Sequence, residues 1–345
     1  MSRRSATSGR WWTRRRSDLA QYPEALGLRG LLNDMVLKDL GLGNMAIKTV
    51  GFIGIGNMGR PMAANLVKGG YRVVAYDADM NRAAQFAEDC GSDCATELGD
   101  LGKQADAIVT MLPTGKEVRA CLMESAGGAL AANLRKGALV MDMSSADPVG
   151  TRALHADLAG RGLALVDAPV SGGVPRATDG SLAIMIGGDA AAVAAAKPVL
   201  AKMGTRLFEV RGPGNGHAMK ALNNFVAGTG FIAVAEAVLV GKKFGLDPAV
   251  MIDVMNVSTG KNFNTENVVK QHVISRQFAS GFALGLLAKD VKIAADLARA
   301  IDVESPLSSL SAALLEEARD EVGFAKDHTL AYTFWERRDK KAAAE

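Results

Sequence analysis

The feature that most constrains the fold is a glycine-rich segment that lies between an apolar strand pattern and a helix pattern. Residues 49–53 are short and apolar, as in a buried strand, and residues 54–59 read Gly-Ile-Gly-Asn-Met-Gly. Pro61 then suits the first turn of a helix over residues 60–66. A strand, GxGxxG and a helix in this order form the context in which the motif binds a dinucleotide.

Each glycine of the motif has a physical reason. Gly54 permits the tight turn, Gly56 lets the backbone approach a pyrophosphate, and Gly59 allows the helix to pack closely on the strand. The N–H groups at the start of the helix add a partial positive charge. We expect the cofactor to contact Gly54, Ile55, Gly56, Asn57, Met58 and Gly59.

An acidic residue follows at the spacing that this type of site requires. The strand pattern over residues 72–76 ends at Asp77, 23 residues after Gly54. A carboxylate in this place binds the ribose hydroxyls of the adenosine and repels a 2′-phosphate. The sequence therefore predicts NAD rather than NADP as the cofactor, a preference that the neighbouring Arg82 would weaken.

Strand patterns alternate with helical stretches up to about residue 210, and helices follow. The further strand patterns cover residues 107–112, 138–141, 163–166, 182–186 and 207–210. The fold class predicted is α/β, with an N-terminal doubly wound Rossmann-type domain over 46–211 and an all-α C-terminal substrate and oligomerisation domain over 212–337. The longest apolar run, 225–240, falls short of the roughly 20 residues that span a bilayer, so we interpret it as a buried helix and expect no membrane partner.

Charge is concentrated outside this pattern. Residues 1–44 hold eight basic and four acidic side chains, whereas the rest of the chain is nearly neutral, which disfavours nucleic-acid binding by the body of the protein. We predict that 1–44 is a basic extension outside the core, and its interpretation as an organelle-targeting presequence or a basic nucleic-acid arm stays open. The three cysteines and four histidines show no disulfide or metal-ligand spacing, so no metal is expected.

Five motifs together carry a family resemblance. They are GFIGIGNMGRPMAANL at 51–66, MLPTGKEV at 111–118, DAPVSGG at 167–173, GNGHAMKALNN at 214–224 and LLAKD at 286–290. In this order they resemble the 3-hydroxyisobutyrate dehydrogenase (β-hydroxyacid dehydrogenase) family. The resemblance covers about residues 48–330 and implies NAD-dependent oxidation of a short 3-hydroxy acid to its semialdehyde, without a metal.

The resemblance also implies a role for particular residues. Lys220 matches the catalytic lysine, and its helix neighbour Asn224 orients that lysine or binds substrate, so both count as catalytic and substrate-binding. Lysine can act as general acid and base when burial or a nearby cation lowers its pKa. The substrate carboxylate is expected at Ser171, Gly172 and Gly173. Further cofactor contacts are expected from Leu112, Pro113, Ser145 and Lys289.

Two other functions remain open on the sequence alone. One is a semialdehyde reductase that acts on tartronate, glyoxylate or succinate semialdehyde. The other is a catalytically silent dehydrogenase fold with a basic arm that binds nucleic acid. We expect a cytoplasmic homo-oligomer whose other partner is a small hydroxy acid or semialdehyde. The sequence leaves the substrate side chain, the physiological direction and the number of subunits undetermined.

Overall fold

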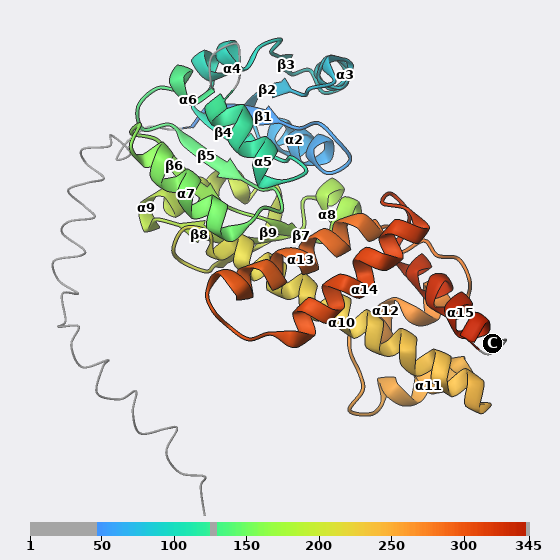
Figure 1. Cartoon of the computed structure of the whole chain (residues 1–345). Coiled ribbons are helices and arrows are strands. Elements are labelled where there is room, and N and C mark those ends of the chain that lie inside the picture. The colour runs from blue at the N-terminus through green and yellow to red at the C-terminus, as the bar shows by residue number, and fades with distance from the viewer. Residues whose placement is uncertain (1–46, 125–129, 343–345) are drawn as a thin grey trace, which may run out of the picture.

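The computed structural model describes residues 47–124 and 130–342, so the extension predicted over 1–44 lies outside the described residues. A twisted sheet flanked by helices is followed by a helical part, into which one long helix runs from the edge of the sheet (Figure 1). The predicted α/β fold class is confirmed.

Within the described residues the sheet has nine strands in the order β3-β2-β1-β4-β5-β6-β8-β7, and β9 pairs with β8. The strands are β1 (Thr49–Ile53), β2 (Arg72–Tyr76), β3 (Asp93–Cys94), β4 (Ala107–Thr110), β5 (Leu139–Asp142), β6 (Ala164–Asp167), β7 (Val170–Ser171), β8 (Leu182–Gly188) and β9 (Gly204–Glu209). The first six pair in parallel, in the classical dinucleotide-binding order. The strand order reverses between β1 and β4, the place where such sheets bind ligands.

Helices cover both faces of the sheet, because strand side chains alternate between two cores. On β1, Phe52 belongs to one core and Ile53 to the other. The helices of this part are α2 (Gly59–Lys68), α3 (Met80–Cys90), α4 (Leu98–Gln104), α5 (Gly115–Arg119), η2 (Ala120–Glu124), α6 (Leu130–Asn133), α7 (Pro148–Ala159), α8 (Gly173–Asp179) and α9 (Ala190–Leu200). Met62 and Leu66 of α2 pack with Phe52, whereas Leu101 of α4 packs with Ile53.

The C-terminal part is helical and has a core of its own around Phe231. Its elements are α10 (Asn215–Phe244), α11 (Pro248–Asn256), α12 (Phe263–Asn267), η3 (Val269–Ile274), α13 (Leu284–Ala300), α14 (Pro306–Val322), η4 (His328–Leu330) and α15 (Ala331–Ala342). Glycines in the left-handed conformation bound α10 at both ends, Gly214 with φ 78° and Gly245 with φ 103°. Helix α10 packs against α13, α14 and strand β8.

Helix α10 is longer than the apolar run that predicted it, since it begins ten residues before Phe225. In the part of the chain that the structure describes, it is the one helix long and apolar enough to cross a membrane by length and composition alone. Phe231, Val234 and Val238 on its inner face are buried in the helical core. This packing is typical of the core helix of a globular domain.

Candidate active site

The glycine segment turns sharply between β1 and α2. Gly54 has φ 98°, and a Cβ atom there would lie 2.3 Å from the carbonyl oxygen of Met111, which follows β4. A Cβ atom on Gly59 would lie 1.8 Å from the Gly54 oxygen. A Cβ atom on Gly56 would meet no atom of the described residues within 4 Å. Two glycines are thus required by the protein's own packing, and the third faces open space.

The start of α2 adds donors beside this open space. Helix α2 begins at Gly59, and its N-cap residue, Met58, makes no side-chain capping hydrogen bond in the part of the chain that the structure describes. Ile55 is buried, Asn57 is exposed and Met58 is half-buried. Uncapped N–H groups and a partial positive charge suit a pyrophosphate. The segment therefore fits the dinucleotide that its sequence predicted.

Asp77, at the end of β2, holds the glycine turn. One carboxylate oxygen accepts from the Ile55 N–H at 2.7 Å, and the other accepts from the Asp79 N–H at 2.9 Å. Each carboxylate oxygen has a second acceptor position, which leaves capacity for a ribose hydroxyl. Arg82 lies 3.3 Å from Asp79 in an ion pair, so its charge is already compensated.

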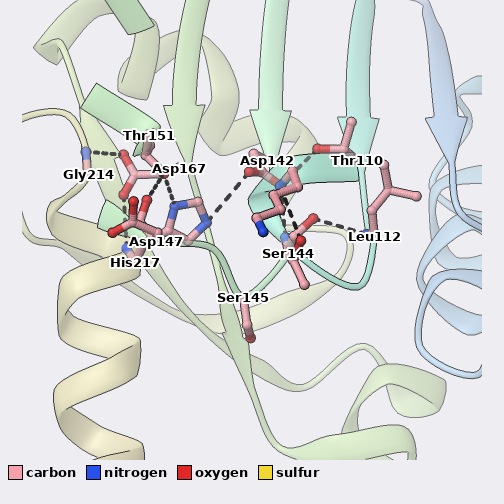
Figure 2. A network of polar contacts seen from close by, with 12 residues as sticks. Thr110, Leu112, Asp142, Ser144, Ser145, Asp147, Thr151, Asp167, Gly214 and His217 are labelled. Carbon is pink, nitrogen blue, oxygen red and sulfur yellow. Dashed lines mark hydrogen bonds and ion pairs between the residues drawn. The ribbon is translucent and has the colours of Figure 1, made fainter. Parts of the chain in front are cut away.

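A second group of predicted residues meets beyond the ends of β4 and β5. Lys289 of α13 donates from Nζ to the carbonyl oxygen of Ser145 at 2.8 Å and to that of Pro113 at 3.2 Å. The Leu112 N–H donates to Ser144 Oγ at 3.0 Å (Figure 2). The structure thus brings together three residues, Pro113, Ser145 and Lys289, that the resemblance assigned to cofactor contact.

Lys220 and Asn224 lie on α10 and converge on α13. Asn224 is buried and donates from Nδ2 to Asp290 Oδ2 at 2.6 Å. Lys289 pairs with the other oxygen of Asp290 at 3.1 Å. In the described part of the chain, no hydrogen bond or ion pair engages the half-buried Lys220 side chain.

The surroundings of Lys220 favour its neutral form. Burial lowers the pKa of the Lys220 amine, the Asp290 carboxylate raises it, and the Lys289 ammonium lowers it, so that the pKa lies below the ordinary lysine value. Burial is the largest of these three effects because an ammonium ion loses hydration in the protein interior. A lowered pKa leaves a larger share of the amine neutral at a given pH and so able to accept a proton.

The Ser171–Gly173 segment joins the end of β7 to the start of α8. Gly172 has φ 135° and Gly173 has φ 66°, conformations that favour glycine. Among the described residues, no hydrogen bond or ion pair joins this loop to Lys220 or Asn224. Strand β8 connects the two regions, since it pairs with β7 and packs against α10.

Several polar residues of this region were not singled out as functional by the sequence. Asp290 holds both Asn224 and Lys289, and its signal was the last letter of the LLAKD motif. Asp142 and Asp167 end two neighbouring strands in register. His217 is buried between these strand ends and Thr151 (Figure 2). Within the described residues, no group of three or more His, Cys, Asp or Glu side chains could hold a metal ion.

Comparison with known proteins matches both parts of the chain. A family model described as the NAD binding domain of 6-phosphogluconate dehydrogenase matches residues 49–212. Another, described as NAD-binding of NADP-dependent 3-hydroxyisobutyrate dehydrogenase, matches residues 214–335.

Curated relatives and a solved structure give the same result. The NAD-dependent L-serine dehydrogenase of Pseudomonas aeruginosa is 35% identical over 78% of this chain and 91% of its own length. The mitochondrial 3-hydroxyisobutyrate dehydrogenase of Bos taurus is 34% identical over 88% of this chain and 87% of its own length. A structure of 3-hydroxyisobutyrate dehydrogenase from Mycobacterium tuberculosis with L-serine is 32% identical, covers 84% of this chain and 99% of that chain, and has a TM-score of 0.78. The chain therefore belongs to the 3-hydroxyisobutyrate dehydrogenase family and is an NAD-dependent oxidoreductase of hydroxy acids.

Proposed function

We propose that this protein oxidises a short 3-hydroxy acid, similar to 3-hydroxyisobutyrate, to its semialdehyde, with Lys220 as general acid and base. The observation that carries the proposal is that polar residues of α10 and α13 lie next to the segments that follow β4 and β5, although these parts are far apart in the sequence. Lys220 and Asn224 of α10 meet Asp290 of α13, and the neighbouring Lys289 reaches the carbonyl oxygens beyond β4 and β5. The proton carrier is thereby next to residues expected at the cofactor.

The chemistry divides between the cofactor and the protein. When bound, the nicotinamide ring supplies the acceptor for a hydride from the hydroxyl-bearing carbon. Neutral Lys220 takes the hydroxyl proton as the carbon–oxygen double bond forms, and in the reverse direction its ammonium form donates that proton. Burial favours the neutral amine that oxidation requires. Asn224 is held by Asp290 and directs the lysine or the substrate.

The relatives support one substrate class. Their names include dehydrogenases of 3-hydroxyisobutyrate, L-serine and 2-(hydroxymethyl)glutarate. These three compounds share a hydroxymethyl group on the carbon that bears the carboxylate, and they differ in the remaining substituent of that carbon. In our proposal Ser171, Gly172 and Gly173 hold the shared carboxylate through backbone N–H groups and a hydroxyl.

The proposal includes the organisation of the chain. Residues 46–211 form the NAD-binding domain and residues 212–337 the substrate and oligomerisation domain. Asp77 gives the preference for NAD over NADP through the adenosine ribose, with Gly54–Gly59, Leu112, Pro113, Ser145 and Lys289 as further contacts. The protein acts in the cytoplasm, and the predicted extension over 1–44 is not part of the catalytic core.

We propose a second copy of this chain as the partner of α10. Four apolar side chains of α10 are exposed: Leu222, Val226, Val240 and Phe244. Leu222 and Val240 lie 18 residues apart, which is five helical turns, and Val226 and Phe244 have the same separation. The two pairs form one apolar face along the helix, a surface that in other proteins marks an interface. Sedimentation analysis should give a dimer or tetramer, and Phe244→Glu with Val226→Glu should give monomers. A monomeric unaltered protein would contradict this part of the proposal.

The test of the activity is a substrate panel followed by one substitution. NADH formation is measured with 3-hydroxyisobutyrate, L-serine and 2-(hydroxymethyl)glutarate, and with lactate as a control that has no hydroxymethyl group. Lys220→Ala should lower kcat by about 10²–10⁴-fold, the usual effect of losing a general acid–base group. Lys242→Ala, at an exposed lysine of the same helix, is the matched control. Turnover of lactate alone would overturn the substrate class, and no turnover at all would favour the silent scaffold.

A further inference from the structure

His217 is a buried histidine with one ring nitrogen, Nε2, that no described residue engages in a hydrogen bond. Its Nδ1 lies 2.8 Å from the Thr151 hydroxyl oxygen. Its Nε2 has no hydrogen-bond partner among residues 47–124 and 130–342 and lies 3.8 Å from Asp142 Oδ2. Figure 2 shows the ring between Thr151 and Asp142, at the carboxyl ends of the parallel strands. A buried polar atom without a partner is costly, so this geometry calls for an explanation.

The neighbours of the ring determine where its proton lies. Asp142 Oδ1 accepts from the Thr110 hydroxyl at 2.9 Å and from the Ser144 N–H at 3.0 Å, so the carboxylate acts as an acceptor. The Thr151 hydroxyl is also 2.9 Å from the Asp147 carbonyl oxygen and can donate either there or to His217. When the Thr151 hydroxyl donates to Nδ1, the single hydrogen of a neutral ring lies on Nε2, which faces the Asp142 carboxylate oxygen. At 3.8 Å the two atoms are too far apart for a hydrogen bond, and a small approach of the two side chains would form one.

His217 and Asp142 link the start of α10 to the segments that follow β4 and β5. His217 lies in the first turn of α10, three residues before Lys220. Asp142 binds the Ser144 N–H, and Ser144 Oγ accepts from the Leu112 N–H beyond β4. A continuous chain of contacts therefore runs from the helix that carries Lys220 to the segments at which the cofactor is expected.

We propose that His217 is a positioning residue, which fixes the rotation of α10 through Asp142 and so holds Lys220 at the reacting hydroxyl. This inference rests on the proposed role of Lys220. The start of α10 is also held by Asp167, whose carboxylate accepts from the Gly214 N–H at 2.9 Å and from the His217 N–H at 3.0 Å. Those two bonds use backbone N–H groups, which every residue except proline provides at position 217. The backbone bonds to Asp167 hold the end of α10 in place. In our proposal the side chain of His217 adds a second constraint, on the rotation of α10 about its own axis.

Substitution of His217 by asparagine or by glutamine tests separately the contact of the ring with Thr151 and its contact with Asp142. The nitrogen of glutamine can occupy the place of Nε2 and reach Asp142, whereas the shorter asparagine reaches only to the place of Nδ1, beside Thr151. His217→Asn should lower kcat about 10–100-fold, since a displacement of about 1 Å at a catalytic group costs up to about 10²-fold. His217→Gln should recover most of this loss. The Kd for NAD should stay within about threefold in both variants, because the glycine segment is unchanged.

The controls distinguish this inference from the proposed function. Lys220→Ala is measured in parallel, and wild-type turnover in that variant would remove the role of Lys220 itself. If Lys220→Ala is inactive while His217→Asn keeps the wild-type kcat, only the positioning role is wrong. Equal losses of kcat in His217→Asn and His217→Gln, with an equally lowered Tm, would show that the ring acts by packing alone.

Asp142→Asn provides a second approach, should both His217 variants fold poorly. It keeps the size of the side chain and removes the carboxylate that Nε2 faces. It should lower kcat by the same factor as His217→Asn, and the double variant should lose little more, because the two residues act as a unit. A wild-type kcat in Asp142→Asn, or fully additive losses, would overturn the inference.

Discussion

Substitution by alanine should affect different properties at two glycines of the nucleotide segment, thermal stability at Gly59 and NAD binding at Gly56. Gly59→Ala places a methyl group 1.8 Å from the Gly54 carbonyl oxygen, a distance that real Cβ atoms do not show. Gly56→Ala places the same methyl group where no protein atom lies within 4 Å. Gly59→Ala should therefore strain the protein even when no cofactor is bound. Gly56→Ala should affect only the binding of the cofactor.

The size of each effect follows from this geometry. The contact at Gly59 must lengthen by more than 1 Å, so the turn and α2 have to move apart. Overpacking of this kind costs about 3 kcal/mol, and a loss of about 2–4 °C in Tm per kcal/mol gives a decrease of about 6–12 °C. Gly56→Ala should leave the Tm within about 2 °C, since φ at this position is not in the left-handed region. Its methyl group should weaken NAD binding about 10–100-fold, or about 1.4–2.8 kcal/mol.

The assay is thermal unfolding with and without NAD, combined with titration of NAD into each variant. Wild-type NAD affinity in Gly56→Ala would refute the placement of the pyrophosphate at this turn. An unchanged Tm in Gly59→Ala would refute the packing argument for the third glycine. Gly160→Ala, just after α7, is the control for glycine loss, because its φ of −61° suits alanine and the nearest atoms to a Cβ there lie at 3.6 Å.

The remaining predictions concern the charges around the site. The rate of oxidation should rise with pH through the pKa of Lys220, and rate profiles from about pH 6 to pH 10 should place this rise below the ordinary lysine range. Asp290→Asn removes a charge that raises the pKa of Lys220 and should move the rise in rate to lower pH. Lys289→Met removes a charge that lowers this pKa and should move the rise to higher pH. Shifts in the same direction in the two variants would contradict the role of Lys220. Asp77→Ala should reduce the ratio of kcat/KM for NAD to that for NADP, and equal use of the two cofactors by the unaltered protein would exclude the proposed role of Asp77.

Local patterns predicted the first half of the fold well. The segment from Thr49 to Asp77 contains a strand, a turn, a helix and a strand, and each of these is determined by residues close in sequence. The antiparallel pairing of β8 with β6 was not predicted, because the direction of a strand depends on the path of the connection and not on its own side-chain pattern. The two-residue strands β3 and β7 are too short to give a periodic signal.

The candidate site was predicted as a set of residues and not as a geometry. The resemblance named Lys289 and Ser145, but 144 residues separate them, and no periodicity indicates that one donates to the other. Asp77 was predicted at the ribose, and the structure adds that it holds the Ile55 N–H. The environment of His217 could not be predicted either, because its partners Thr151 and Asp142 come from other elements of the fold.

The position of Lys220 depends on the register of two strands. Asp142 and Asp167 pair as neighbours at the ends of β5 and β6, so both carboxylates reach the same edge of the sheet. The positive end of α10 meets them there, since Asp167 accepts from the N–H groups of His217 and of Gly214, the residue before the helix, and Asp142 faces His217. Apolar packing between α10 and the sheet has no preferred direction, whereas these hydrogen bonds do. A one-residue slip between β5 and β6 would separate the two carboxylates and release the helix. The alignment that we propose between Lys220 and the cofactor therefore depends on strand pairing in the sheet, even though Lys220 belongs to the helical part of the chain.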